Sequence, residues 1–591
     1  MNKFKYMLAA AIVGVSLTAC DDDDDYGVLD GIGMVNRSVS IQDGALLRPS
    51  STSQVSLTYN NLVGIDPSVP VTLNGQTVTP VVNPDNGMEL IIPLNLAYGL
   101  DYTLEVPQGA VYRSDDKSVI AESKTITFST KVGIDKSLVA TSLSNANASV
   151  QAKEVYNLLL ANYGEKQISG AMGEVAWGLG FTNLVAQEAG KTPAIVGFDY
   201  IHLASSPCNW IDYADITPVQ TVWNNGGIPA MTWHWNVPKS EVKTVATVWE
   251  GDVAMPGDWS GNVMVVPAPE DESQKEEGQN YFDFSGVQVG QSLKITTSNV
   301  AAGAQGSIKG NDWAEITPGS EYFDITGDYT WVIDADMLAK LQAGGLIISG
   351  HDYNVTGIYI AEGDSSLGGY SCDNTTFSPS KIFEEGSWEN GIYKADVEKL
   401  AGYLTILRDA GIPVLWRPFH EAAGDYKDGG ESGAWFWWGR EGVEVTKQLW
   451  IKLYNDLTNV YGLNNLIWVW TVQTTHNYVL ASVDDVKSSY PGDQYVDILC
   501  ADLYEDPFTN HTDKFDLVNA TADRTKIVAL GEIGNMLDID GAKADNALWS
   551  YFMGWYEQDD NGPAFKSWNL NGEWQTALSN PLILNQGDLN F

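Results

Sequence analysis

The sequence predicts an α/β protein built around a (β/α)8 TIM barrel, with β-sandwich segments before the barrel and inserted within it. Three observations predict this fold. Strand-like apolar runs alternate with helical segments in residues 133–249 and 369–591, and two of the runs end in a glutamate. A Gly-rich, β-like stretch at residues 250–368 interrupts the alternation. Because 591 residues exceed what one hydrophobic core supports, several domains are expected.

The N-terminus has the pattern of a secretory signal. Lys3 and Lys5 precede an apolar run from residue 7 to residue 15, and Leu17-Thr-Ala-Cys20 follows. This last string resembles a bacterial lipobox, which implies that residues 1–19 are removed and that Cys20 is lipidated. Ordinary cleavage beside an incidental cysteine is the alternative.

An acidic run follows Cys20. Asp21 to Asp25 cannot pack into a core, so residues 20–26 are expected to form a solvated tether. The run resembles the export signal of Bacteroidetes surface lipoproteins. We therefore expect an outer-membrane lipoprotein exposed at the cell surface, with a periplasmic location as the alternative.

Composition limits the partners. A net charge of -43 and a pI near 4.2 argue against nucleic acid and against anionic lipid surfaces as partners. The 21 Trp and 27 Tyr suit sugar rings, whose apolar faces stack on aromatic side chains.

The three other cysteines do not form a disulfide framework, because their number is odd. Cys208 and Cys372 lie in polar, loop-like sequence, and whether they pair is left open. Cys500 ends an apolar run and is expected to be a buried thiol.

Residues 27–132 alternate apolar and polar positions between turn signals, which predicts short strands of a β-sandwich. The stretch from Tyr98 to Val111 resembles bacterial Ig-like modules. Such a module is most simply a spacer.

The barrel strands can be placed one by one. Gln167–Gly170, Pro193–Asp199 and Ile228–His234 are predicted as strands one to three, and Ser149–Asn162 as a helix before them. After the insertion, Tyr393–Ala410 is predicted as a helix. The remaining strands are predicted at residues 412–416, 466–471, 496–502, 526–530 and 550–555.

The inserted stretch at residues 250–368 is far longer than an ordinary connecting loop. Its sequence, with Trp313 and Trp331, loosely resembles carbohydrate-binding modules. A structural lid without affinity for sugar is the equal alternative. Because it follows strand three, it should rise from the face that carries the active site.

Glu421 and Glu532 are the candidate catalytic pair. Each comes just after a strand-like run, and the stretch between them has room for about two strand–helix units, which fits positions after strands four and seven. Two carboxylates about 5 Å apart are what a retaining glycosidase needs.

Arg417 and His420 precede Glu421 in the same motif. Arg417 can hold a neighbouring carboxylate ionised through its planar fork of donors. A zinc site is disfavoured because the string after His420 lacks the second histidine of H-E-x-x-H. A strand-end salt bridge is the alternative, which the second glutamate weakens.

These motifs resemble glycoside hydrolase family 26, best known for β-mannanases. The resemblance rests on Arg417-Pro-Phe-His-Glu421, Trp435-Phe-Trp-Trp-Gly439 and Gly531-Glu532, and it covers residues 150–591 apart from the insertion. It implies that His234 binds substrate beside the reactive sugar, that Tyr504 contacts the nucleophile and that Trp555 lies under the reactive ring. His420, Arg417, Trp435 and Trp438 are further candidates for substrate binding. The longer segment 425–433 departs from the family pattern and puts the predicted roles of Trp435 and Trp438 in substrate binding in doubt.

The implied activity is retaining hydrolysis of β-1,4-mannan or galactomannan, without cofactor or metal, by a monomer. Glu532 would act as the nucleophile and Glu421 as the acid/base. Burial should raise the pKa of Glu421, while Arg417 and Tyr504 should keep Glu532 ionised. The alternatives are the same chemistry on xylan or mixed-linkage glucan, and a glycan-binding surface protein with a decayed site.

Overall fold

The computed structural model describes residues 33–591, except 175–176, 242, 256, 258, 260–262, 269–280, 363–368, 424–432, 477–478, 505–507, 556–557, 560–561 and 564–571. The chain divides into two compact units, Met1–Val132 and Gly133–Phe591. Cys20 and the predicted signal and tether lie outside the described residues. Among the residues described, no helix has the length and apolar composition needed to cross a bilayer.

The N-terminal unit consists of short strands around its own core. Its sheets have the orders β1-β3-β8-β7, β11-β10-β4 and β2-β12-β9-β5-β6. Alternating side chains such as Val55, Leu57 and Tyr59 fill the core. The strands are β1 (Asn36–Val39), β2 (Ala45–Leu47), β3 (Gln54–Tyr59), β4 (Val63–Ile65), β5 (Val71–Leu73), β6 (Gln76–Val78), β7 (Val81–Asn83), β8 (Asn86–Pro93), β9 (Asp101–Val106), β10 (Val111–Arg113), β11 (Asp116–Ile120) and β12 (Lys124–Thr130). The assignment to the Ig-like type stays a prediction.

The second unit contains a parallel sheet in the order β14-β15-β16-β27-β28-β31-β32. Its strands are nearly all apolar because helices cover them outside and side chains fill the interior. They are β14 (Gly170–Met172), β15 (Ile195–Asp199), β16 (Ile228–Thr232), β27 (Val414–Arg417), β28 (Leu466–Thr471), β31 (Ile498–Leu503) and β32 (Ile527–Ile533).

Residues 550–555 close this sheet into a barrel. The N–H of Gly554 donates to the carbonyl of Gly170 in β14, and the N–H of Trp555 donates to the carbonyl of Ile533 in β32. The segment bridges both edge strands in parallel, as the predicted eighth strand would.

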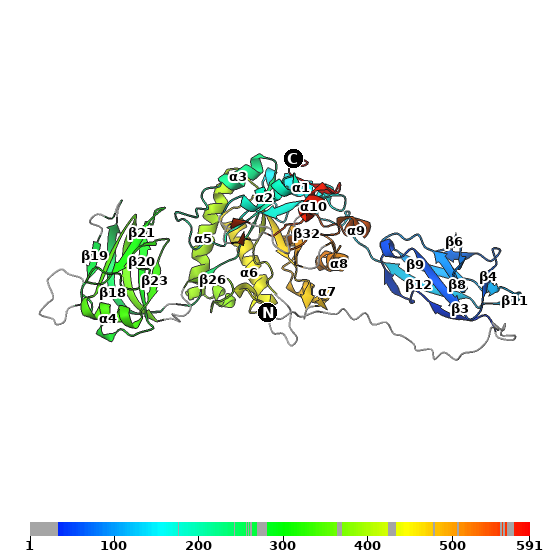
Figure 1. Ribbon diagram of the computed structural model, residues 1–591, viewed down its shortest axis with the longest axis horizontal. Helices are drawn as coiled ribbons and strands as arrows, with labels where there is room; N and C mark the ends of the chain where they lie inside the picture. The colour runs from blue at the N-terminus through cyan, green and yellow to red at the C-terminus, as the bar shows by residue number, and fades with distance from the viewer. Residues whose placement is uncertain are drawn as a thin grey trace. The chain divides into compact units, whose positions relative to one another are not determined.

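Helices lie around the outside of the strands (Figure 1). Ser149 caps α1 by accepting a hydrogen bond from the N–H of Ala152, and Ser387 caps α5 in the same way, so α5 begins before the predicted Tyr393. The helices of the barrel are α1 (Val150–Asn162), α2 (Gly180–Ala189), α3 (Thr217–Asn224), α5 (Trp388–Asp409), α6 (Val443–Asn455), α7 (Val483–Ser489), α8 (Thr512–Thr521), α9 (Ile539–Ala544) and α10 (Glu573–Ser579).

The segment between barrel strands three and four forms two four-stranded antiparallel sheets, β18-β25-β20-β23 and β19-β24-β21-β22, around a core of its own. The chain leaves the barrel for this segment at β17 (Val237–Pro238) and returns at β26 (Tyr370–Ser371), and these two strands pair with each other. The elements are β18 (Lys243–Met255), β19 (Val263–Val266), β20 (Ser292–Ser298), β21 (Gln305–Lys309), β22 (Phe323–Asp324), β23 (Tyr329–Val332), α4 (Ala335–Gly344), β24 (Leu346–His351) and β25 (Tyr353–Glu362).

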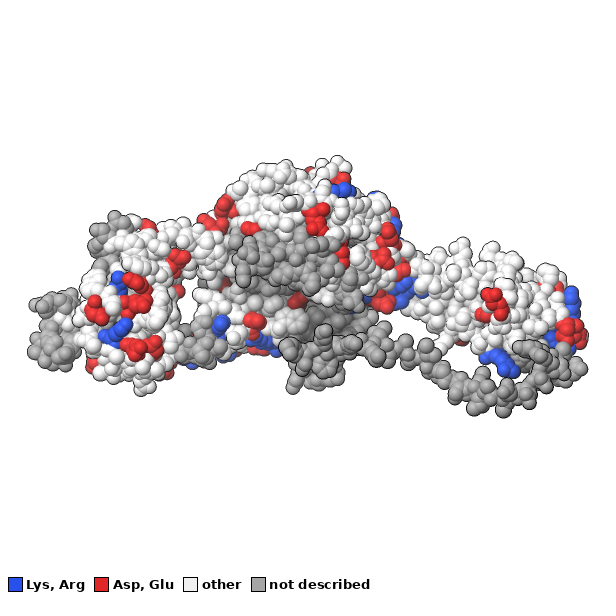
Figure 2. All heavy atoms as spheres, in the orientation of Figure 1, with Lys and Arg blue, Asp and Glu red and all other residues white. Residues whose placement is uncertain are grey.

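The three described cysteines are free thiols. Cys500 is fully buried in β31, as predicted, whereas no disulfide joins Cys208 and Cys372. On the face shown in Figure 2, the described Asp and Glu side chains are spread in small groups. The described Lys and Arg side chains form no continuous basic patch on this face, which agrees with the negative net charge of the sequence.

Candidate active site

Three carboxylates meet at the C-terminal end of the barrel strands. Glu421 follows β27, Asp502 lies in β31, and Glu532 lies in β32. One carboxylate oxygen from each residue lies within 4.8 Å of the others. The structure therefore brings together the two glutamates singled out in the sequence and adds an aspartate.

Arg417 supplies the positive charge of this cluster. Its Nη1 donates to Oδ2 of Asp502 over 2.8 Å, and its Nη2 donates to Oε1 of Glu532. Burial penalises the guanidinium, but the two carboxylates outweigh this penalty and raise the pKa of Arg417 well above its ordinary value. The oxygen spacing would also suit a metal ion, and the guanidinium already neutralises two of the three acids.

Gly531 makes this arrangement sterically feasible. A Cβ atom there would lie 2.6 Å from Oδ1 of Asp502, 2.8 Å from Sγ of Cys500 and 3.1 Å from Cδ of Arg417. Only glycine lets β31, β32 and the arginine approach so closely. This explains in physical terms the glycine that precedes Glu532.

Glu421 is held in an unusual backbone conformation. Its φ is 49° and that of Phe419 is 50°, both in the left-handed region that costs non-glycine residues free energy. Burial, then the negative charges of Glu532 and Asp502, raise the pKa of Glu421 well above its ordinary value. Glu421 is therefore suited to carry a proton at neutral pH, as predicted for the acid/base residue.

Tyr504 contacts the other glutamate. Its hydroxyl donates to Oε2 of Glu532 over 2.6 Å, while Arg417 donates to Oε1. Both oxygens of Glu532 thus accept hydrogen bonds, which hold the side chain in one orientation. Burial and the charge of Glu532 raise the pKa of Tyr504 well above its ordinary value, so the phenol keeps its proton.

A chain of hydrogen bonds runs behind the carboxylates. Nδ1 of His234 lies 2.6 Å from Oδ2 of Asp199, and its Nε2 lies 3.1 Å from Nε2 of His420. Nδ1 of His420 lies 3.3 Å from the Thr232 hydroxyl, which donates to the carbonyl of Arg417.

Two assignments of protons satisfy every contact in this chain, because either His234 or His420 can carry the extra proton. Electrostatics favour His234 as the imidazolium, which donates to Asp199 and to His420, while neutral His420 donates to Thr232. Burial opposes charge on His234, but Asp199 outweighs it and raises its pKa, whereas burial and His234 lower the pKa of His420 well below its ordinary value.

The tryptophan run corrects one prediction. Trp438 is fully buried, stacks on Phe436 and donates its indole N–H to the carbonyl of His420 over 2.9 Å. It therefore has no face for a sugar, contrary to the predicted substrate contact. His420 is likewise only 1% exposed, so it too supports the site from behind instead of facing substrate.

Trp435 behaves differently. It is 41% exposed, and its indole N–H donates to Oε2 of Glu421 over 3.0 Å. Trp555 is half-buried, with its ring 5.8 Å from that of His234. Trp435 thus lies against Glu421 and Trp555 lies beside His234; the contact of either ring with substrate stays a prediction.

A pocket of about 240 Å³ opens beside Glu421. Polar side chains from β28, from the segment after it and from α8 line it together with Glu421, Trp435 and Tyr504; they include Thr471, Gln473, Thr475 and Lys514. The pocket joins an aromatic surface to hydrogen-bonding groups, the combination that sugar rings require.

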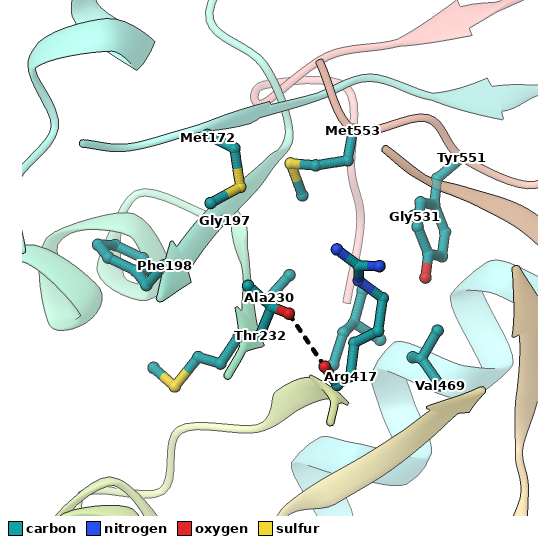
Figure 3. A pocket seen from close by; sticks show the side chains of 12 residues that line it. Met172, Gly197, Phe198, Ala230, Thr232, Arg417, Val469, Gly531, Tyr551 and Met553 are labelled. Carbon is teal, nitrogen blue, oxygen red and sulfur yellow. Dashed lines mark hydrogen bonds between the residues drawn. The ribbon is translucent and has the colours of Figure 1, made fainter. Parts of the chain in front are cut away.

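The barrel interior next to Arg417 is tightly filled. Figure 3 shows Arg417 among Met172, Met553 and Tyr551, and the Thr232 hydroxyl bonded to the Arg417 carbonyl. The cavity that remains is about 20 Å³, room for roughly one water molecule. The side chains packed in the barrel interior hold Arg417 in place, and Arg417 in turn positions Glu532 through its hydrogen bond.

Asp199 and Asp502 are the two site residues that the sequence did not point out. Both lie at or near the ends of predicted strands, so the rule applied to the two glutamates would also have found them. A single aspartate at a strand end is too common to stand out without its histidine or arginine partner.

The model of glycosyl hydrolase family 26 matches residues 144–255 and 296–587, more than half of the chain. The chain belongs to this family. Such membership agrees with the motifs at Glu421 and Glu532, and it establishes the (β/α)8 barrel as the fold of the catalytic domain.

Several known proteins are similar to the chain. A mannan endo-1,4-beta-mannosidase of Thermothelomyces thermophilus is 24% identical over 444 residues, which are 75% of this chain and 62% of that protein. Mannan endo-1,4-beta-mannosidase B of a Piromyces species is 32% identical over 216 residues, which are 36% of this chain and 33% of its own length. The chain thus spans less than two thirds of these relatives.

Among solved structures, the family 26 domain of an endo-beta-mannanase/endo-beta-glucanase from Prevotella bryantii matches with a TM-score of 0.50 and 27% identity. The match covers 76% of this chain and 100% of that domain. A ruminal family 26 endo-beta-1,4-mannanase has a TM-score of 0.52 at 20% identity, covers 94% of this chain and 93% of its own, and supports the fold alone.

Proposed function

We propose that the chain is a retaining endo-β-1,4-mannanase that hydrolyses mannan or galactomannan. The observation that carries the proposal is the spacing of Glu421 and Glu532: one carboxylate oxygen of each lies within 4.8 Å of the other. Retaining glycosidases place their two carboxyl groups about 5 Å apart, whereas inverting enzymes need roughly 6.5–9.5 Å to admit a water. Similar family members named as mannan endo-1,4-beta-mannosidases support the choice of substrate.

In this mechanism, Glu532 attacks the anomeric carbon as a carboxylate while Glu421 protonates the departing glycosidic oxygen. Glu421 then takes a proton from water, which hydrolyses the glycosyl–enzyme. The site suits both roles, because Arg417 and Tyr504 donate to Glu532 whereas burial and neighbouring charges raise the pKa of Glu421.

The remaining residues bind or position. His234, Trp435 and Trp555 offer polar and aromatic surfaces to the sugars. Arg417 and Tyr504 hold the nucleophile. His420 and Trp438 act from behind, because both are buried and Trp438 donates to the His420 carbonyl. A decayed site would not need this full set of contacts.

A product profile tests the proposal. We expect short mannooligosaccharides from galactomannan and glucomannan, and NMR should show that the first product keeps the β-anomer. Glu532→Gln should reduce this release by about 10⁴-fold or more. The matched control is Glu389→Gln, which changes a glutamate that is only 5% exposed on α5, outside the site, and should leave release unchanged. Release from xylan or mixed-linkage glucan alone, or an α-anomeric product, would overturn it.

We also propose that the protein is a monomeric lipoprotein anchored through Cys20 and exposed on the outer membrane. The support is the signal-like N-terminus with Leu17-Thr-Ala-Cys20 and the acidic run after it. Labelling with a fatty-acid analogue should depend on Cys20. External protease should remove the protein from intact cells; a protein protected until the outer membrane is opened would instead be periplasmic.

A further inference from the structure

One side of the inserted segment carries aromatic side chains outside its core, of which Tyr322 is exposed and Trp259 and His351 are partly buried. In β21 and β24, Ile308 and Ile348 point into the core, so the alternate positions in both strands point outward. These outward positions include Ser307 and Lys309 in β21 and His351 in β24. Tyr322, next to β22, lies on the other side of β21 from His351.

Trp259 joins the two sides. Its ring lies 5.4 Å from that of Tyr322 and 5.4 Å from that of His351, nearly perpendicular to both. The indole therefore lies across β21. Lys309 completes the group, with its Nζ 5.7 Å from the centre of the Tyr322 ring. We call Trp259, Lys309, Tyr322 and His351 the aromatic face.

The aromatic face is not explained by packing. Its rings lie on the side of the sheet away from the core, and Tyr322 is 62% exposed. Below them, the hydroxyl of Ser307 is fully buried and has no hydrogen-bond partner within the described chain. Covering a polar group in this way costs free energy that water would otherwise recover. The exposed ring of Tyr322 is therefore the part of the face that a ligand can contact directly.

The charges of the face favour an uncharged ligand. Lys309 is the cation, and Asp324 at the edge accepts a hydrogen bond from Gln305. His351 is paired with Asp352 over 2.8 Å. Groups of both signs thus lie close together between the strands, and the exposed ring of Tyr322 supplies apolar surface bordered by hydrogen-bonding groups.

We propose that the aromatic face is a second glycan-binding site that holds an uncharged β-linked polysaccharide chain by stacking on Tyr322 and Trp259. The ligand would be the polymer that the barrel cleaves, so this choice rests on the proposed function. Binding at the insert keeps long chains near the barrel without any part in the chemistry.

The test compares the full chain with Tyr322→Ala and with Trp259→Ala. The matched control is Tyr359→Ala, which removes a tyrosine bonded to Glu250 in the other sheet of the insert. Binding to insoluble β-mannan is measured in a Glu532→Gln background, and hydrolysis of mannotetraose is measured with Glu532 intact. We expect each face variant to weaken binding to the polymer by about tenfold, with mannotetraose turnover and the control unchanged.

Tyr322→Phe keeps the ring and should retain binding, which separates loss of the ring from loss of folding. Full binding by a double variant of Tyr322 and Trp259, or a loss equal to that of Tyr359→Ala, would overturn the proposal. The result is independent of the catalytic assignment: a chain that binds mannan through this face but fails to cleave it refutes the proposed activity alone.

Discussion

Both oxygens of Asp199 bind His234: Oδ2 lies 2.6 Å from Nδ1, and Oδ1 accepts the backbone N–H over 3.1 Å. This double contact fixes the ring and its charge at once. Through Nε2 of His234 the arrangement continues to His420, whose motif carries Glu421. A carboxylate at the end of β15 thereby orders the segment that carries the proposed acid/base residue.

Asp199→Asn should destabilise the protein by about 3 kcal/mol near neutral pH, because it leaves a buried imidazolium without its counter-charge. The pKa of His234 is raised above 6.5, so its stabilisation is complete below that value and is lost as pH rises through the raised pKa. The pKa of Asp199 is lowered below 3.8, so its stabilisation is present above that value and is lost as pH falls further.

Urea unfolding at a series of pH values checks this prediction. The difference between wild type and Asp199→Asn should be greatest at about pH 5, where both groups are charged, and should shrink toward alkaline pH. A difference that does not change with pH would show that Asp199 acts through packing instead of charge.

Trp435→Phe should extend activity to higher pH. The indole N–H stabilises the ionised form of Glu421 and so lowers its pKa, and phenylalanine keeps a ring but removes the donor. Because the reaction needs protonated Glu421, the alkaline limb of kcat/KM should move upward, with the maximal kcat within about tenfold of wild type. An unchanged or downward limb would contradict the role of this hydrogen bond.

Trp438→Phe should lower stability by roughly 2–4 kcal/mol, because it leaves space in a filled core and removes the donor to the His420 carbonyl. KM should change little, since Trp438 has no exposed face. Chemical denaturation and initial rates on the same preparations give both values. A large rise in KM without loss of stability would restore the predicted sugar contact.

Most of the barrel could be predicted from the sequence because buried parallel strands give short apolar runs. The run at residues 466–471 coincides with β28, and the ends of the fourth and seventh strands located Glu421 and Glu532. The family motif added His234, Tyr504 and Trp555; in the structure Tyr504 donates to Glu532, and Trp555 lies beside His234.

The side chains behind the site could not be predicted in this way. In Trp435-Phe-Trp-Trp-Gly439 a short helical turn leaves Trp435 exposed and directs Trp438 inward, and no periodicity in so short a run shows which ring is which. Asp502 was missed because its importance comes from Arg417, a residue 85 positions away in the chain.

Asp502→Asn should shift the alkaline limb in the direction opposite to Trp435→Phe. Burial raises the pKa of Asp502 to about 7, Arg417 opposes the rise and Glu532 adds to it, so wild-type Asp502 ionises as pH passes neutrality. The new negative charge then makes Glu421 hold its proton more tightly. Asparagine never ionises, so Glu421 should lose its proton, and the enzyme its activity, at a lower pH than in wild type.

The measurement is kcat/KM against pH for wild type, Asp502→Asn and Trp435→Phe in one buffer series. Because asparagine keeps an oxygen for Arg417, Glu532 should stay in place and the maximal kcat should fall by less than about 100-fold. Alkaline limbs displaced in opposite directions would show that loss of the Glu421 proton sets the alkaline limit of activity. A limb that both variants leave unmoved would mean that another group sets the alkaline limit.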